Sequence, residues 1–349
     1  MSGARIAWPL AVRMAGKVAG SYGLEGTYHD ALLSRQAPEF VHEASRMVEE
    51  ETGLRASGEP RVVVTGRQQW VANNVQAFSL LLAPAEKRFA ERVKGLSGAV
   101  AGRVMAAEVG ALLGLLARRV LGQYDLVLPT GGDSGGEAGD TVLFVGPNVL
   151  LMERLHAFRP AEFRMWLALH ECTHRLQFTG VPWMRDHFLG LIQELVASAV
   201  PEPRRLVRVA GELRRSAATG QPLLGEAGLI GLLATPAQRQ LLDRVQALMS
   251  LLEGHGHVVM DRVGARTLVT QERMSRVLRR RRQDLKSSLF FRLTGLELKL
   301  SQYELGERFV LEVESKGGRG SLDRVWGGPE LLPTLEEIRR PTRWLARVA

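Results

Sequence analysis

The sequence predicts an α+β protein that is mainly α-helical and contains a small β-hairpin or sheet. Two observations lead to this prediction. Over most of the chain, apolar residues recur three or four positions apart, the spacing that gives a helix one apolar face. Short apolar runs bounded by turn residues, which are typical of strands, occur at 60–65, 125–129 and 141–146.

Residues 1–95 are predicted to form a mainly helical N-terminal part. Apolar spacing indicates helices over 6–19 and roughly 38–52. After the strand at 60–65, a helix is expected over 67–82, and another begins near Pro84. We interpret these helices as scaffold.

Residues 96–349 are predicted to form the catalytic part. It begins with a helix over 95–121, whose glycines and alanines permit close packing against neighbours. The strands at 125–129 and 141–146 then flank the loop TGGDSGGEAGD at 130–140. This loop lacks the GK[ST] ending of a phosphate-binding loop, so it is expected to connect a hairpin. The hairpin either binds a substrate backbone by strand addition or is purely structural.

An HExxH motif lies in the helix predicted over 161–178, and its residues are His170, Glu171 and His174. Residues four apart lie on one face of a helix, so both imidazoles can point at one ion. Glu171 would then reach the water on that ion. A zinc ion with two histidines and a third ligand lowers the pKa of its water to about 7. The motif therefore indicates a zinc hydrolase, and the alternative is two hydrogen-bonded core histidines.

The composition of the chain limits the classes of protein to which it can belong. With 349 residues, 45% of them hydrophobic and 24% charged, the chain is expected to be soluble and globular. Its single cysteine, Cys172, makes no internal disulfide, which favours a reducing compartment. The apolar run near the N-terminus is too short for a signal peptide, and no run is long enough to span a bilayer. We expect a cytoplasmic protein without a membrane partner.

The net charge of +9 raises the question of nucleic-acid binding. Arginines cluster at 204–215 and 276–282, but no zinc-finger, helix-turn-helix or RNA-binding signature accompanies them. We interpret the clusters as solvated helix faces and expect no nucleic-acid partner. An acidic partner or substrate is the alternative.

Two glutamates compete for the third ligand position. Glu194 lies on the helix predicted over 183–199, twenty residues after His174, a distance that resembles the one in thermolysin-like peptidases. Gln193 stands where those enzymes carry asparagine. Glu253 lies in the apolar helical run LLEGHGHVVMD, which follows two or three helices predicted over 207–252. We favour Glu253 because titratable groups gather around it.

Three polar residues follow Glu253 within that run. His257 and Asp261 fall on the same helix face and would orient the ligand. His255 lies on a different face, where it would stabilise an oxyanion if the helix bends at Gly254 or Gly256. For both histidines the alternative is an ordinary polar residue at a helix surface.

Five segments carry a family resemblance: VLFVGPN at 142–148, HECTHRLQFTGVPWMRDH at 170–187, MSLLEGHGHVVMD at 249–261, GLELKLSQYELGERFV at 295–310 and RVWGGPELLPTLEEI at 324–338. With them the chain resembles the bacterial zincin-like hydrolases, described as zinc-dependent metalloproteases and, in one branch, as coenzyme F420 biosynthesis-associated proteins. The resemblance covers most of the chain beyond residue 60.

The resemblance implies a largely helical single unit, here 1–349, in which the HExxH helix lies in an arrangement unlike that of well-studied peptidases. It also implies Zn²⁺ bound by His170 and His174, with Glu253 as the plausible third ligand. In zinc peptidases a Tyr, His or Arg commonly stabilises the transition state, and Tyr303 and Arg308 are candidates here. Packing and surface pairing are the favoured interpretation of these two.

The sequence as a whole predicts a cytoplasmic zinc metallopeptidase, with Glu171 as general base and a peptide or other amide as substrate. A zinc amide hydrolase that is not a peptidase, acting for instance on a cofactor precursor, is the first alternative. The second is a catalytically silent basic protein with a structural zinc that binds partners or nucleic acid.

Overall fold

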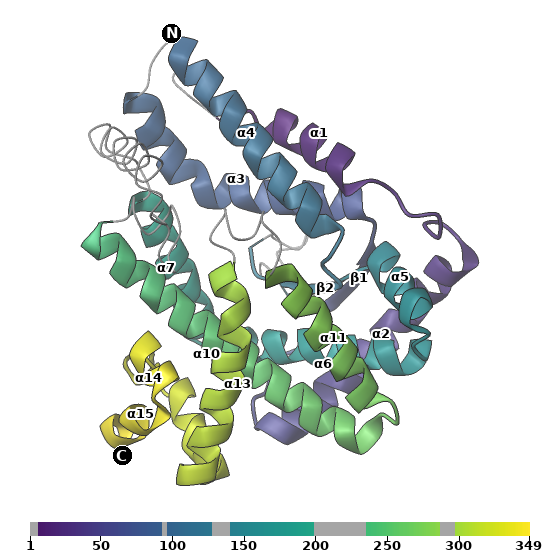
Figure 1. Cartoon of the computed structure of the whole chain (residues 1–349), viewed down its shortest axis with the longest axis vertical. Helices are drawn as coiled ribbons and strands as arrows, with labels where there is room; N and C mark the ends of the chain where they lie inside the picture. The colour runs from purple at the N-terminus through teal and green to yellow at the C-terminus, as the bar shows by residue number, and fades with distance from the viewer. Residues whose placement is uncertain (1–5, 93–95, 128–139, 199–234, 287–296) are drawn as a thin grey trace, which may run out of the picture. The chain divides into compact units, whose positions relative to one another are not determined.

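The computed structural model describes residues 6–92, 96–127, 140–198, 235–286 and 297–349 (Figure 1). Within these ranges the chain is mainly helical with one three-stranded sheet, which confirms the predicted fold class. The helices predicted from residue 207 to the Thr235 break and nearly all of the loop at 130–140 lie outside the described residues.

The chain forms two compact units. The first comprises Met1–Arg185 and Val259–Gln271, and the second comprises Asp186–Val258 and Glu272–Ala349. Both sides of residue 95 belong to the first unit, so the predicted boundary there does not separate compact units. That residues 1–349 act as one functional unit stays a prediction.

Six helices of the first unit are described, and their bounds are α1 (Trp8–Ala19), α2 (Tyr28–Thr52), α3 (Arg67–Arg92), α4 (Leu96–Ala117), α5 (Gly146–His156) and α6 (Pro160–Thr179). Helix α1 packs along α4 (Figure 1). A Cβ added to Gly110 of α4 would lie only 2.5 Å from the carbonyl oxygen of Ala11. The prediction that small residues let this helix pack closely is confirmed.

Helices α2 and α3 are longer than predicted, because each continues through a proline. Pro38 lies inside α2 and removes one helical hydrogen bond, at a cost of about 3 kcal/mol. The buried face of α2 offsets that cost, since Leu33, Ala37 and Val41 continue it on both sides of the proline. This face packs against α6. Helix α3 likewise runs through Pro84 as a single helix.

The sheet of the first unit consists of β1 (Arg61–Thr65), β2 (Gly122–Asp125) and β3 (Thr141–Val145) in the order β1-β3-β2. Strand β3 lies in the centre: it is parallel to β1 on one side and antiparallel to β2 on the other. The predicted β2–β3 hairpin pairing is confirmed, but β2 begins earlier than the apolar run at 125–129. The register explains the shift: Asp125 lies opposite Thr141, the first residue of β3, so the residues after it have no partner there.

The motif helix α6 is the most deeply buried helix of this unit, and it contacts α2, α5, β2 and β3. Its buried apolar residues include Phe163, Leu169 and Leu176. The helix ends at Thr179, close to the predicted end, and the N–H of Gly180 donates to the carbonyl of Leu176 at 2.8 Å. Burial on several sides gives the polar side chains of α6 fixed surroundings.

The helices of the second unit include α7 (Met184–Ser198), α10 (Pro236–Thr267), α11 (Gln271–Lys286), α13 (Glu297–Gly317), α14 (Leu335–Arg339) and α15 (Pro341–Val348), with 3-10 turns at Arg319–Trp326 and Pro329–Leu331. One end of each of three helices belongs to the first unit: the start of α7, the end of α10 and the first residue of α11. A core cluster of Phe309, Val325 and Trp344 joins the chain end to α13, and Trp326 packs against it. None of the described helices is both long and apolar enough to cross a membrane.

Arginines on α11 pair with nearby carboxylates. Arg276 reaches Glu272 at 2.6 Å, and Arg279 lies 3.8 Å from Glu307 of α13. The arginines and Glu272 are largely exposed, whereas the Glu307 side chain is 25% exposed. The pairs agree with our interpretation of this cluster as a solvated helix face, whereas the cluster at 204–215 lies outside the described residues.

Helices α10 and α13 meet backbone to backbone. A Cβ on Gly254 would overlap the backbone of Gly306, and a Cβ on Gly306 would overlap the carbonyl group of Ser250. Gly254 directly follows Glu253, so this crossing fixes the part of α10 that carries the candidate ligand. Helix α10 runs through Gly254 and Gly256 without interruption.

Gly306→Ala is expected to destabilise the protein by about 1–3 kcal/mol, because the added methyl forces two packed helices apart. Urea unfolding of the full chain measures this loss. Gly190→Ala on α7 is the matched control, since no atom lies within 4 Å of its added Cβ and alanine is the better helix former. Equal unfolding midpoints for Gly306→Ala and the unchanged protein would contradict the close crossing.

Candidate metal centre

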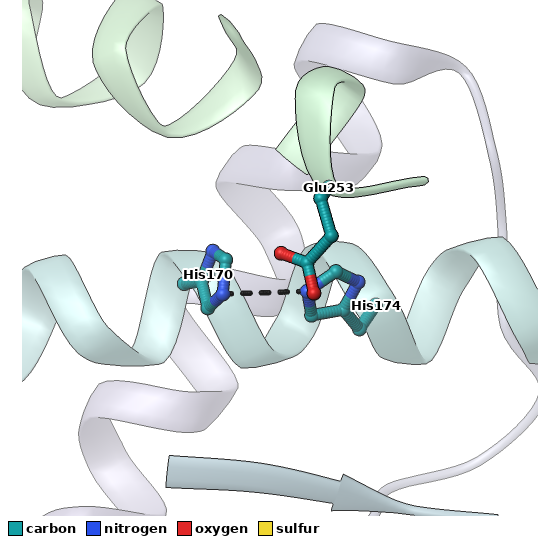
Figure 2. A group of neighbouring side chains, drawn as sticks. All are labelled: His170, His174 and Glu253. Carbon is teal, nitrogen blue, oxygen red and sulfur yellow. Dashed lines mark hydrogen bonds between the residues drawn. The ribbon is translucent and has the colours of Figure 1, made fainter. Parts of the chain in front are cut away.

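His170 and His174 lie one turn apart on α6, and their rings meet edge to face with their centroids 4.6 Å apart (Figure 2). Their Nε2 atoms are 3.3 Å apart. Two nitrogens bound tetrahedrally to one zinc ion, each at about 2.0–2.1 Å, are separated by about 3.3–3.4 Å. The pair therefore has the spacing that a single zinc ion requires.

Gln177 orients the second histidine. The Nδ1 atom of His174 lies 2.9 Å from Oε1 of Gln177, and the Gln177 side chain is fully buried. When Nδ1–H donates to this carbonyl oxygen, Nε2 carries the free electron pair of a metal ligand. Sequence reasoning did not single out Gln177. The signal was present, because a glutamine three residues after His174 interrupts an apolar stretch on the ligand side of the helix.

Glu253 completes a group of three side chains that could hold a metal ion. One ligand atom each from His170, His174 and Glu253 lies within 4.8 Å of the others. Figure 2 shows the Glu253 carboxylate directed toward the two rings. Two imidazoles and one carboxylate are a donor set that zinc accepts in hydrolases, with one position left for water.

Glu194, the other candidate ligand, is not a member of that group. Its side chain is 61% exposed and lies 3.8 Å from the guanidinium of Arg244. Of the two glutamates that sequence reasoning weighed, Glu253 is the one found with the histidines. Sequence reasoning favoured this residue although Glu253 follows His174 by about eighty residues.

Glu171 is buried, with 4% of its surface exposed, and it does not belong to the ligand group. Its side chain lies against the backbone of β2. A Cβ added to Gly122 would fall 2.8 Å from Cδ and 2.9 Å from Cγ of Glu171. The carboxylate of the predicted base is thus held next to an edge strand of the sheet.

Arg175 ties the motif helix to the sheet. Its guanidinium donates to Asp140 at 2.8 and 2.9 Å and to the carbonyl of Gly58 at 2.6 Å. Asp140 directly precedes β3, and Arg175 is almost fully buried. Bidentate pairs of this kind give geometric specificity as well as energy. The pair fixes α6 against β3 one turn after Glu171.

Cys172 faces α2 and not the candidate metal site. Its thiol lies 3.4 Å from the hydroxyl of Ser45 and 3.4 Å from the carbonyl of Val41, both on α2. Burial raises the pKa of the thiol to about 12. Because the neutral thiol is a poor nucleophile and a poor ligand, Cys172 acts in packing.

The remaining predicted site residues do not join the ligand group. His255 is buried, and its ring meets Trp326 edge-on at 5.1 Å. Helix α10 shows no break at the glycines beside it, so the bend required for an oxyanion role is not present, and that role stays a prediction. His257 is buried as well. Asp261 accepts a hydrogen bond from Gln271 at 2.7 Å.

Arg308 and Tyr303 on α13 are the two candidates for stabilising the transition state. Arg308 is exposed and donates to the carbonyl of Arg339 at 3.1 Å, which agrees with surface pairing. The side chain of Tyr303 lies outside the described part of the structure. A role for Tyr303 in the transition state stays a prediction.

Gln177→Leu is expected to weaken zinc binding about 10–100-fold, because His174 loses the partner that selects its tautomer. Competition with a chromophoric chelator measures the affinity. Gln69→Leu is the control, since Gln69 is exposed and donates to Asn73 one turn further along α3. Zinc affinity unchanged by Gln177→Leu would exclude the orienting role.

A buried helix with two imidazoles at zinc spacing, a third carboxylate within reach and a separate glutamate beside them defines the metal-dependent hydrolases of the HExxH class. The comparisons with known proteins narrow this class. The model of the zincin-like metallopeptidase family matches residues 6–345, so the chain belongs to that family. Membership implies hydrolysis as the chemistry and zinc as the cofactor, and it confirms the resemblance found in the sequence.

A solved structure covers the chain almost completely. The protein from Chloroflexus aurantiacus, described as "a putative hydrolase with a novel fold", is 31% identical, and 98% of each chain is covered with a TM-score of 0.73. A search of curated proteins finds no match. The chain therefore shares its fold with this protein.

Proposed function

We propose that this protein is a zinc metallopeptidase. His170 and His174 would bind the ion through Nε2, and the Glu253 carboxylate would supply the third ligand. The observation that carries the proposal is the grouping of these three ligand atoms within 4.8 Å, with the two nitrogens at zinc spacing. The single buried cysteine agrees with action in a reducing compartment, the cytoplasm.

Zinc, when bound with one open position, lowers the pKa of a water molecule to about 7 and polarises a carbonyl group. Glu171 would accept the proton of that water at a carboxylate oxygen and later give it to the leaving amine. Burial against β2 supports this role, because a carboxylate shielded from bulk water keeps the proton for transfer. Gln177 would hold His174 in the ligating tautomer throughout.

Strand β2 supports a peptide as the substrate. It pairs with β3 on one side and forms an edge of the sheet within the described residues. An extended peptide can add to such an edge through main-chain hydrogen bonds. A peptide bound there would have its backbone next to Gly122, the residue against which Glu171 lies.

The test combines metal analysis with a substrate panel. We expect the purified full chain to contain one zinc ion, to cleave members of a peptide library, and to lose this activity with 1,10-phenanthroline and regain it with zinc. Hydrolysis of small amides without cleavage of any peptide would replace the proposal with an amide hydrolase. A metal-free native protein, or zinc with no open position together with salt-sensitive nucleic-acid binding, would reject it.

A further inference from the structure

Gly122 occupies a position where no other residue fits beside Glu171. The Cβ of any other amino acid would lie 2.8 Å from Cδ of Glu171 and would overlap its Oε1. Unbonded carbon atoms approach to about 3.5–4.0 Å, so the carboxyl group and such a Cβ would compete for the same space. The volume that a side chain at residue 122 would fill is here filled by Glu171.

Backbone conformation does not require a glycine at this position. Gly122 is paired within β2, opposite Phe144, and its φ lies outside the positive range that favours glycine. Glycine in a strand weakens it and often marks a close approach of another group. Space for Glu171 is the physical reason that the structure offers for glycine here.

Strand β2 cannot easily withdraw from α6. Gln123 faces α3 and accepts hydrogen bonds from Trp70 Nε1 at 2.7 Å and from Asn74 at 3.3 Å. Tyr124 faces the other way, and its ring stacks on Phe178 of α6 at 6.3 Å. Because successive residues alternate between the faces of a strand, Gly122 shares the α6 face with Tyr124. Contacts on both faces hold the strand in place.

Helix α6 is equally constrained, because Arg175, one turn after Glu171, is bound to Asp140 and to the carbonyl of Gly58. A methyl group at residue 122 would therefore be accommodated by moving the Glu171 side chain, the most adjustable of the groups involved. The carboxylate would turn away from β2.

We propose that Gly122 is a positioning residue for Glu171. By lacking a side chain, it reserves the space in which the carboxylate is held. The steric part of this proposal, that a side chain at residue 122 would displace Glu171, follows from the geometry of the first unit alone. Its catalytic part rests on the proposed function, in which Glu171 is the base.

A double-mutant cycle on the full chain tests the steric part without reference to activity. Gly122→Ala is expected to lower the thermal unfolding midpoint by about 2–4 °C. In the Glu171→Ala background the same change is expected to cost almost nothing, because the competing carboxylate is gone. Gly66→Ala is the matched control in the same unit. Its Cβ would lie at an ordinary 3.6 Å from Glu25, so we expect no dependence on Glu171.

Kinetics on the zinc-loaded enzyme test the catalytic part. Gly122→Ala is expected to keep full zinc content and a KM within about twofold, while kcat falls at least about tenfold through the misplaced base. A fall in kcat with zinc retained supports the proposal even if the unfolding midpoint does not move. A clear unfolding loss that is the same in both backgrounds, or an unchanged kcat, would overturn it. If the native protein hydrolyses nothing, the proposed function fails, and the unfolding cycle still decides the steric relation.

Discussion

Glu171→Gln is expected to lower kcat by about 10²–10⁴-fold while the zinc content stays the same. Glutamine has nearly the shape of glutamate, so it fits the space beside Gly122, but its amide cannot accept the proton of the attacking water. Glu171 is outside the ligand group, so its charge is not needed to hold the ion. Steady-state kinetics on a cleaved peptide, together with elemental analysis, measure both quantities.

Glu43→Gln is the control for this change, because Glu43 is an exposed carboxylate on α2. It should leave kcat and zinc content unaltered. Turnover retained by Glu171→Gln would remove the residue from the role of base. Loss of zinc in that variant would instead indicate that Glu171 helps to bind the ion.

Glu253→Gln is expected to weaken zinc binding by more than about 100-fold, beyond the 10–100-fold typical of a partner that only orients a ligand. The substitution removes the negative charge of the carboxylate, and the amide oxygen that remains is a much weaker donor to zinc. Chelator competition at constant pH measures the affinity, and circular dichroism of the variant checks that its helices are retained.

Glu194→Gln provides the matched comparison, because it removes the rival carboxylate by the same chemical change. Glu194 is largely exposed and lies near Arg244, so its loss should leave zinc affinity unchanged. The opposite pattern, with zinc lost only in Glu194→Gln, would transfer the third ligand position to α7.

Features that depend on local spacing could be predicted from the sequence alone. Apolar residues three and four positions apart determined the helical character of most of the chain, and the fold class was correct. His170 and His174 share a helix face because they are four residues apart, whatever surrounds the helix. The end of α6 follows a local signal too, Gly180 with Pro182 beyond it, and Gly180 itself keeps a right-handed φ of −78°.

Tertiary structure decided the features that depend on distant partners. Helix α2 continues through Pro38 because its buried face packs on α6, and β2 begins at Gly122 because β3 sets its register. Glu253, which the sequence favoured over Glu194, lies near histidines about eighty residues earlier only because the chain folds back on itself. Gly122 leaves space for Glu171, and Gly254 leaves space for the crossing of α10 and α13. In both places the essential feature is a missing side chain. No local pattern distinguishes such glycines, because only the atoms packed against them make a missing Cβ necessary.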